Sequence, residues 1–141
     1  MARWAECLAP GGWMALVEVD DLLGHGPMQS AMRAEVLAFY ASARDRYDFE
    51  CGRRLAGAVE RAGLALLQEG TVEDDELSFH GQAPEDVLTA WRLRLDRMPG
   101  LRAFWGDRVS DFEGALLGSM ASAEHRSTTR VIMVVGRRPA G

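Results

Sequence analysis

The chain has 141 residues, 48% of them hydrophobic and 26% charged, which suits a single domain with a buried core. Sixteen basic residues, all arginine, against 21 acidic residues leave a net charge of −5. This balance argues against nucleic acid as the main partner, because phosphate binding needs concentrated positive charge.

Cys7 and Cys51 are the only cysteines, too few and too far apart for a zinc site. Without a secretory signal they are expected to be free thiols, and we expect a cytoplasmic location. No apolar run approaches the roughly 20 residues that span a bilayer, so no membrane association is predicted.

The first strong pattern is a Pro-Gly-Gly turn at residues 10–12 followed by the apolar run of residues 13–19. The run is too continuous for a surface strand and predicts a central strand buried on both faces. Residues 2–8 suit the last turns of a helix that enters this turn. The chain is therefore expected to begin halfway through a larger fold.

Two helices are predicted next. Apolar residues recur at three- and four-residue spacing over residues 28–47, which predicts an amphipathic helix. A second helix is predicted over residues 51–62, with Gly63 as its left-handed stop.

Residues 64–72 are predicted to form a strand, and the acidic residues 73–75 a turn. Residues 77–79 could pair back on that strand or extend it past a bulge. The register of this region stays open at the level of sequence.

The remaining elements are two helices and a strand. Helices are predicted over residues 85–98 and 110–121, with Ser110 and Glu113 at capping-box spacing in the second. The β-branched run of residues 128–136 predicts a strand in the middle of a sheet.

This order of elements is that of an α/β domain, and it resembles the C-terminal half of a class I S-adenosylmethionine-dependent methyltransferase. The similarity is to the small-molecule branch related to ubiquinone biosynthesis. Three motifs carry it: Leu8-Ala9-Pro10-Gly11-Gly12 with the strand to Val19, Arg61-Ala62-Gly63-Leu64, and Thr129–Pro139.

The resemblance implies part of a Rossmann-like fold: a three-stranded mixed sheet block with about four to five helices. Its last strand would run antiparallel between the other two. In that family the S-adenosylmethionine-binding elements lie upstream, and no G-x-G-x-x-G turn follows a strand in residues 1–141. The prediction is a single domain that lacks the cofactor loop and binds no S-adenosylmethionine alone.

Candidate site residues follow the first strand, because ligands in open α/β sheets gather beyond the carboxyl ends of strands. They are Glu18, Asp20, Asp21 and His25, and by resemblance this rim faces a small-molecule methyl acceptor. Asp20 and His25 are the candidates for a base that takes a proton from the acceptor. An acidic, solvated loop is the alternative reading, and no catalytic residue is assigned.

Aromatic residues supply the other substrate-binding candidates. By resemblance Tyr40 and Trp91 lie in segments that cover the acceptor, but the pattern favours core packing as the role of each. His80 and His125 stand alone in predicted loops, and residues 73–76 form a solvated acidic turn, so no metal site is predicted.

Two functions remain. One is the acceptor-side half of a methyltransferase, inactive until completed by a cofactor-binding half. The other is a non-catalytic remnant or accessory module that forms a homodimer through an exposed edge at residues 13–19.

Overall fold

The computed structural model describes residues 2–140, which form two compact units built from separate stretches of chain. Unit 1 contains the residues up to Leu22, Phe49–Asp74 and the residues from Arg130. Unit 2 contains Leu23–Asp48 and Asp75–Thr129. The single-domain assignment of residues 1–141 stays a prediction.

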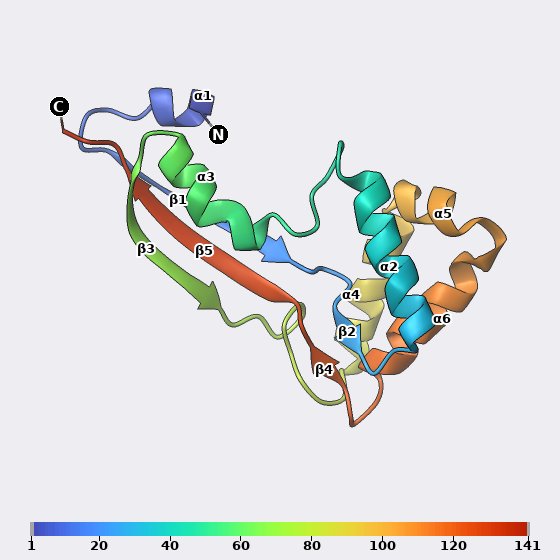
Figure 1. Ribbon diagram of the computed structural model, residues 1–141. Coiled ribbons are helices and arrows are strands. Elements are labelled where there is room, and N and C mark those ends of the chain that lie inside the picture. The colour runs from blue at the N-terminus through green and yellow to red at the C-terminus, as the bar shows by residue number, and fades with distance from the viewer. Residues whose placement is uncertain (1, 141) are drawn as a thin grey trace. The chain divides into compact units, whose positions relative to one another are not determined.

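Unit 1 is a three-stranded sheet with a short helical layer (Figure 1). In chain order its elements are α1 (Ala2–Glu6), β1 (Trp13–Asp20), the 3₁₀ turn η1 (Gly52–Arg54), α3 (Leu55–Arg61), β3 (Ala65–Val72) and β5 (Arg130–Arg137).

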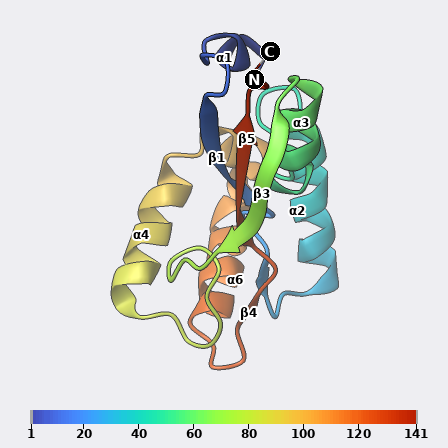
Figure 2. The same cartoon turned by 90° about the vertical axis from the view of Figure 1, so that its left-hand side faces the viewer.

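The last strand lies in the middle of this sheet. The order is β1-β5-β3, and β5 pairs antiparallel with both neighbours (Figure 2). The predicted position and direction of the last strand are therefore confirmed. The prediction of a mixed sheet is wrong, however, because both pairings are antiparallel. β1 and β3 run parallel to each other but are not neighbours.

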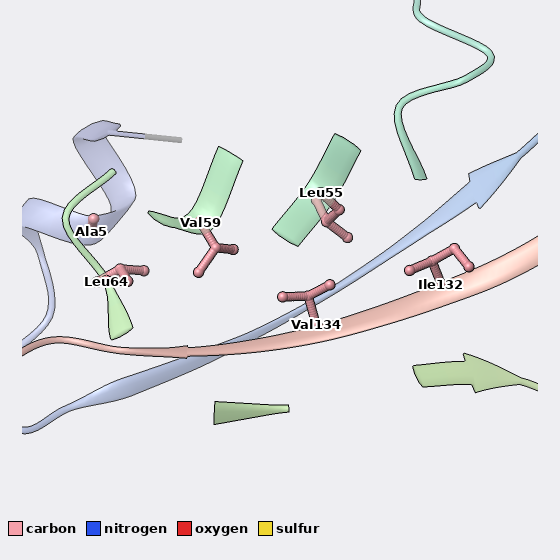
Figure 3. Packing of buried hydrophobic residues seen from close by; sticks show 6 residues of the cluster. All are labelled: Ala5, Leu55, Val59, Leu64, Ile132 and Val134. Atoms are coloured by element: carbon pink, nitrogen blue, oxygen red, sulfur yellow. The ribbon is translucent and has the colours of Figure 1, made fainter. Parts of the chain in front are cut away.

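One face of the sheet carries the core of unit 1. Ile132 and Val134 on β5 pack against Leu55 and Val59 at α3, with Leu64 and Ala5 completing the cluster (Figure 3). Each fully buried Val, Leu or Ile side chain contributes about 1.5–3 kcal/mol relative to exposure. Ile132 and Val134 of the run that predicted β5 are thus buried under α3.

Strand β1 differs from its prediction. It is an edge strand, and its exposure alternates along the chain instead of being low throughout. Trp13 is 65% exposed and Val17 is 57% exposed, while Met14 and Leu16 pack against the core cluster. Only one face of β1 is therefore buried, the face that packs against the core cluster beside α3.

The connection from α3 to β3 agrees in part with the prediction from the sequence. Gly63 has φ +78°, a left-handed conformation that glycine adopts without steric cost, and it ends the helix as predicted. The predicted helix 51–62 divides into η1 and α3. A bulge interrupts β3 between Leu66 and Gln68, and residues 77–79 neither pair back nor extend the strand.

Unit 2 is mainly helical. Its elements are β2 (His25–Gly26), α2 (Ser30–Ala43), α4 (Glu85–Asp96), α5 (Pro99–Trp105), the 3₁₀ turn η2 (Gly106–Arg108), α6 (Val109–Met120) and β4 (Arg126–Ser127). The described chain thus has six α-helices in place of the predicted four or five. The pairing of β2 with β4 was not predicted, because two-residue strands leave no hydrophobic period.

The helices of unit 2 enclose an aromatic core. Trp91 and Phe112 are fully buried, and the Phe112 ring stacks on Trp105 with centroids 4.1 Å apart. The predicted capping box is wrong, since α6 begins after Arg108 and has no side-chain cap. Burial of one helix face, rather than capping, stabilises α6.

Length also bounds what these helices can do. Helix α2 has 14 residues, and within residues 2–140 no helix combines the length and hydropathy needed to cross a membrane.

Candidate functional site

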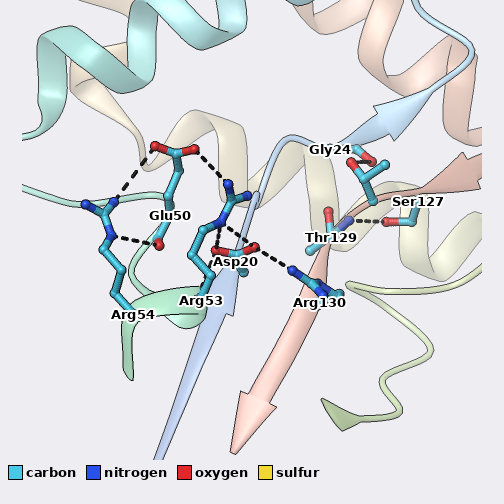
Figure 4. A network of polar contacts seen from close by, with 9 residues as sticks. Asp20, Gly24, Glu50, Arg53, Arg54, Ser127, Thr129 and Arg130 are labelled. Carbon is cyan, nitrogen blue, oxygen red and sulfur yellow. Dashed lines mark hydrogen bonds and ion pairs between the residues drawn. The ribbon is translucent and has the colours of Figure 1, made fainter. Parts of the chain in front are cut away.

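Asp20, the last residue of β1, is the centre of a polar network in unit 1 (Figure 4). Its side chain is 1% exposed. Arg53 donates to this carboxylate from its backbone N–H at 3.2 Å and from Nε at 3.0 Å. Arg130 donates to the second oxygen from Nη2 at 3.3 Å.

These contacts set the charge of Asp20. Burial alone would raise its pKa, but the hydrogen bonds and charge of Arg53, together with the hydrogen bond of Arg130, lower the pKa below the ordinary 3.8. Asp20 is therefore ionised at neutral pH and is a weak base. Such a carboxylate suits positioning better than proton abstraction.

The backbone around Asp20 is equally constrained. A Cβ at Gly52 would lie 2.7 Å from the Cβ of Asp20, so the close approach of η1 to the strand end requires glycine. Asp21 has φ +58°, and its N–H donates to the carbonyl of Phe49 at 2.8 Å. Gly52 and these two aspartates therefore fix where the chain leaves β1.

Glu18 lies two residues earlier on β1, opposite Ile132 of β5. Its Oε1 accepts from the N–H of Val19 at 3.4 Å. Structure places Glu18, Asp20 and Asp21 in unit 1, whereas His25, Tyr40 and Trp91 belong to unit 2.

His25 lies in a buried stack of rings in unit 2. Its Nδ1 is 3.0 Å from Nε2 of His125, and its ring meets Trp91 edge-on with centroids 4.8 Å apart. The Phe79 ring contacts both histidines, with centroids 4.4 Å from His125 and 5.8 Å from His25. His125 is therefore not isolated, contrary to the sequence prediction.

The hydrogen-bond partners assign the tautomers of the two histidines. Nδ1 of His125 is 3.1 Å from the carbonyl oxygen of Gly81, which can only accept, so this nitrogen carries the proton. In the neutral ring Nε2 is then an acceptor and takes the Nδ1–H of His25. The pair ties β2 to the loop at Gly81.

Burial favours the neutral form of His125. Removal from solvent lowers the pKa of His125 below the ordinary 6.5, despite the opposing bond to Gly81. Nε2 of His25 is buried as well. A base that takes a proton from a ligand must reach it. His25 is among the residues that line a groove of unit 2, but its buried Nε2 favours a positioning role.

Tyr40 and Trp91 also have interior positions. The hydroxyl of Tyr40 accepts from the N–H of Leu23 at 2.7 Å. Nε1–H of Trp91 donates to the carbonyl of Glu76 at 2.8 Å. Each polar tip is thus used within unit 2, which agrees with the core-packing alternative for both residues.

A groove of about 380 Å³ opens beside this stack. Its walls include Gly24, Pro27, Met28, Arg33, Glu124 and Arg126, all of unit 2. The sequence gives no signal for the two arginines or Glu124, because Arg33 lies about ninety positions from the other two and the three form no motif. Within residues 2–140, no three His, Cys, Asp or Glu side chains could together hold a metal ion.

The chain has a distant likeness to solved structures. No family model matches the chain, and no curated protein matches it. A phosphoethanolamine N-methyltransferase 2 from Haemonchus contortus, solved with phosphomonomethylethanolamine and S-adenosylhomocysteine, aligns with 15% identity and a TM-score of 0.43. The alignment covers 98% of this chain and 29% of that chain. Similarity at this level assigns no activity to the present chain.

Replacing Asp20 by Asn tests the network at the end of β1. The substitution removes the charge that Arg53 and Arg130 neutralise, and we expect the free energy of unfolding at neutral pH to fall by about 2 kcal/mol. Urea titration measures this change. Because the folded pKa is depressed, the contribution of Asp20 is full above the unfolded pKa and is lost as pH falls through the folded one.

The matched control is Glu69→Gln, at an exposed position of β3, where a change within about 0.5 kcal/mol is expected. Equal stability of the wild type and Asp20→Asn at neutral pH would contradict the assigned role.

His125 makes the stability of the chain depend on pH. Its folded pKa is lowered, so the unfolded chain binds the extra proton first as pH falls, and stability should decline below about pH 7 until the folded pKa is passed. The variant His125→Gln lacks this proton and should have a shallower slope. A nuclear magnetic resonance titration that places the folded pKa of His125 at or above 6.5 contradicts the prediction.

Proposed function

We propose that this chain supplies the acceptor-side, sheet-completing half of an S-adenosylmethionine-dependent methyltransferase that acts on a small molecule. The observation that carries the proposal is the sheet order, with β5 antiparallel between β1 and β3. This is the arrangement that the resemblance of the sequence implies for the final three strands. The ubiquinone-biosynthesis-like branch is part of the same proposal.

In this proposal the cofactor is bound by elements outside residues 1–141. No G-x-G-x-x-G turn follows a strand of this sequence, so the chain alone is expected to be inactive. Methyl transfer is an in-line displacement that depends mainly on proximity and alignment. The contribution of this chain is to bind the acceptor, and the Asp20 network fixes the chain that follows β1.

A second candidate is an accessory module that self-associates through β1. The observation in its favour is that β1 is an edge strand with Trp13 and Val17 exposed. Unpaired backbone groups beside apolar side chains are a template for pairing with another strand. In this reading a second copy of the chain pairs with residues 13–19.

A fusion tests the methyltransferase proposal. Residues 8–141 are joined behind the cofactor-binding half of a ubiquinone-biosynthesis methyltransferase, and formation of S-adenosylhomocysteine is followed with a panel of small hydroxyl, amine and thiol compounds. The fusion should bind S-adenosylmethionine and methylate at least one compound. The 141-residue chain alone should do neither in calorimetry and in the same assay.

A fusion that folds and binds the cofactor, yet methylates nothing in a panel accepted by the intact family, counts against the proposal. Micromolar binding of S-adenosylmethionine by the chain alone would show that the cofactor elements are not missing.

The accessory-module reading predicts a concentration-dependent dimer that Val17→Lys disrupts. A lysine at this exposed edge position opposes strand pairing by charge, while the residue's exposure leaves the core intact. Light scattering measures the mass of both proteins. The exposed Leu93→Lys on α4 is the matched control, and a monomeric wild type rules this reading out.

A further inference from the structure

The groove of unit 2 is built on a hydrogen-bonded frame. β2 and β4 pair through His25 with Ser127 and Gly26 with Arg126. Beside them Thr128 donates to the carbonyl of Gly24 from its backbone N–H at 2.7 Å and from its hydroxyl at 3.1 Å. Hydrogen bonds of this kind hold the groove wall before any ligand arrives.

Charge in the groove is predominantly positive. Arg33 on α2 and Arg126 on β4 line it, and Glu124 is the acidic residue among its lining, so two cations face one anion. Nη1 of Arg126 donates to the carbonyl of His125 at 2.8 Å, which orients the guanidinium. An arginine held in one direction loses less side-chain entropy when it binds a ligand.

The rest of the lining limits the size and polarity of a ligand. Pro27 and Met28 contribute apolar surface, and the volume of about 380 Å³ lies in the range of small-molecule sites, roughly 300–1,000 Å³. Guanidinium groups match the paired oxygens of a carboxylate or phosphate. A compact apolar body with one anionic end satisfies both parts of the groove.

We propose that this groove binds a small organic anion, a carboxylate or a phosphate on a compact apolar body, through Arg33 and Arg126. Only the identification of this anion as the methyl acceptor rests on the proposed function. The binding itself needs no cofactor and is measured without one.

Nuclear magnetic resonance titration of the full chain tests the site with four probes. Benzoate and phenyl phosphate carry the anion, and benzamide and benzyl alcohol are their neutral counterparts. The anions should shift the amide signals of Gly24, Gly26 and Thr128. Added salt should lower the affinity of both anions. Equal shifts with benzamide, or none with either anion, overturn the proposal. The anion that binds more tightly shows whether the groove prefers a carboxylate or a phosphate.

Variants of opposite charge give the second test. Arg126→Gln should weaken binding of the preferred anion roughly tenfold, whereas Glu124→Gln should strengthen it about threefold. Both residues are exposed, so the variants should keep the wild-type spectrum. Arg97→Gln, an exposed arginine on the C-terminal side of α4, makes the same change of charge outside the groove lining.

Wild-type affinity in Arg126→Gln, or weaker anion binding in Glu124→Gln, overturns the site. Loss of affinity in Arg97→Gln equal to that in Arg126→Gln also overturns it, since net charge then explains the effect. Anion binding that passes every test, combined with a fusion that transfers no methyl group, would disprove the methyltransferase proposal and leave this one standing.

Discussion

Strand β5 pairs with β1 on one side and β3 on the other, and each residue from Val131 to Gly136 faces a partner on a neighbouring strand. β1 and β3 have no ladder with each other, so the final strand is what joins them. Its Ile132 and Val134 also supply the side chains against which α3 packs. Backbone pairing and burial thus depend on the same eight residues, and unit 1 cannot form its core before its last strand is present.

The Asp20 network depends on that pairing. Asp20 lies opposite Arg130 in the β1–β5 register, which brings one of its two arginines to it, while the close approach at Gly52 brings Arg53. A buried carboxylate is stabilised only when such partners compensate for lost solvation. The same compensation lowers its pKa, which explains why a residue chosen as a candidate base serves better as a fixed, charged anchor.

In unit 2 a buried histidine pair lies beside a charged groove. Burial lowers the pKa of His125, which lies 3.0 Å from His25, and the arginines that could bind an anion line the groove. Removing charge from the interior avoids a desolvation cost, whereas Arg126 at the surface keeps its charge without one. The two units therefore offer different chemistry: an ion-paired strand end in one and a cationic groove in the other.

The sequence by itself determined the local features. Periodicity located α2, α4 and α6, the β-branched run located β5, and Gly63 ended α3, because each depends on residues close together in the chain. The tertiary structure alone decided the environment of each site. Apolar residues 13–19 are the same in a central strand or at an edge, and only the sheet order left Trp13 and Val17 exposed. His25 and His125 meet across a hundred positions, and contacts at that separation leave no period or spacing that a sequence pattern could reveal.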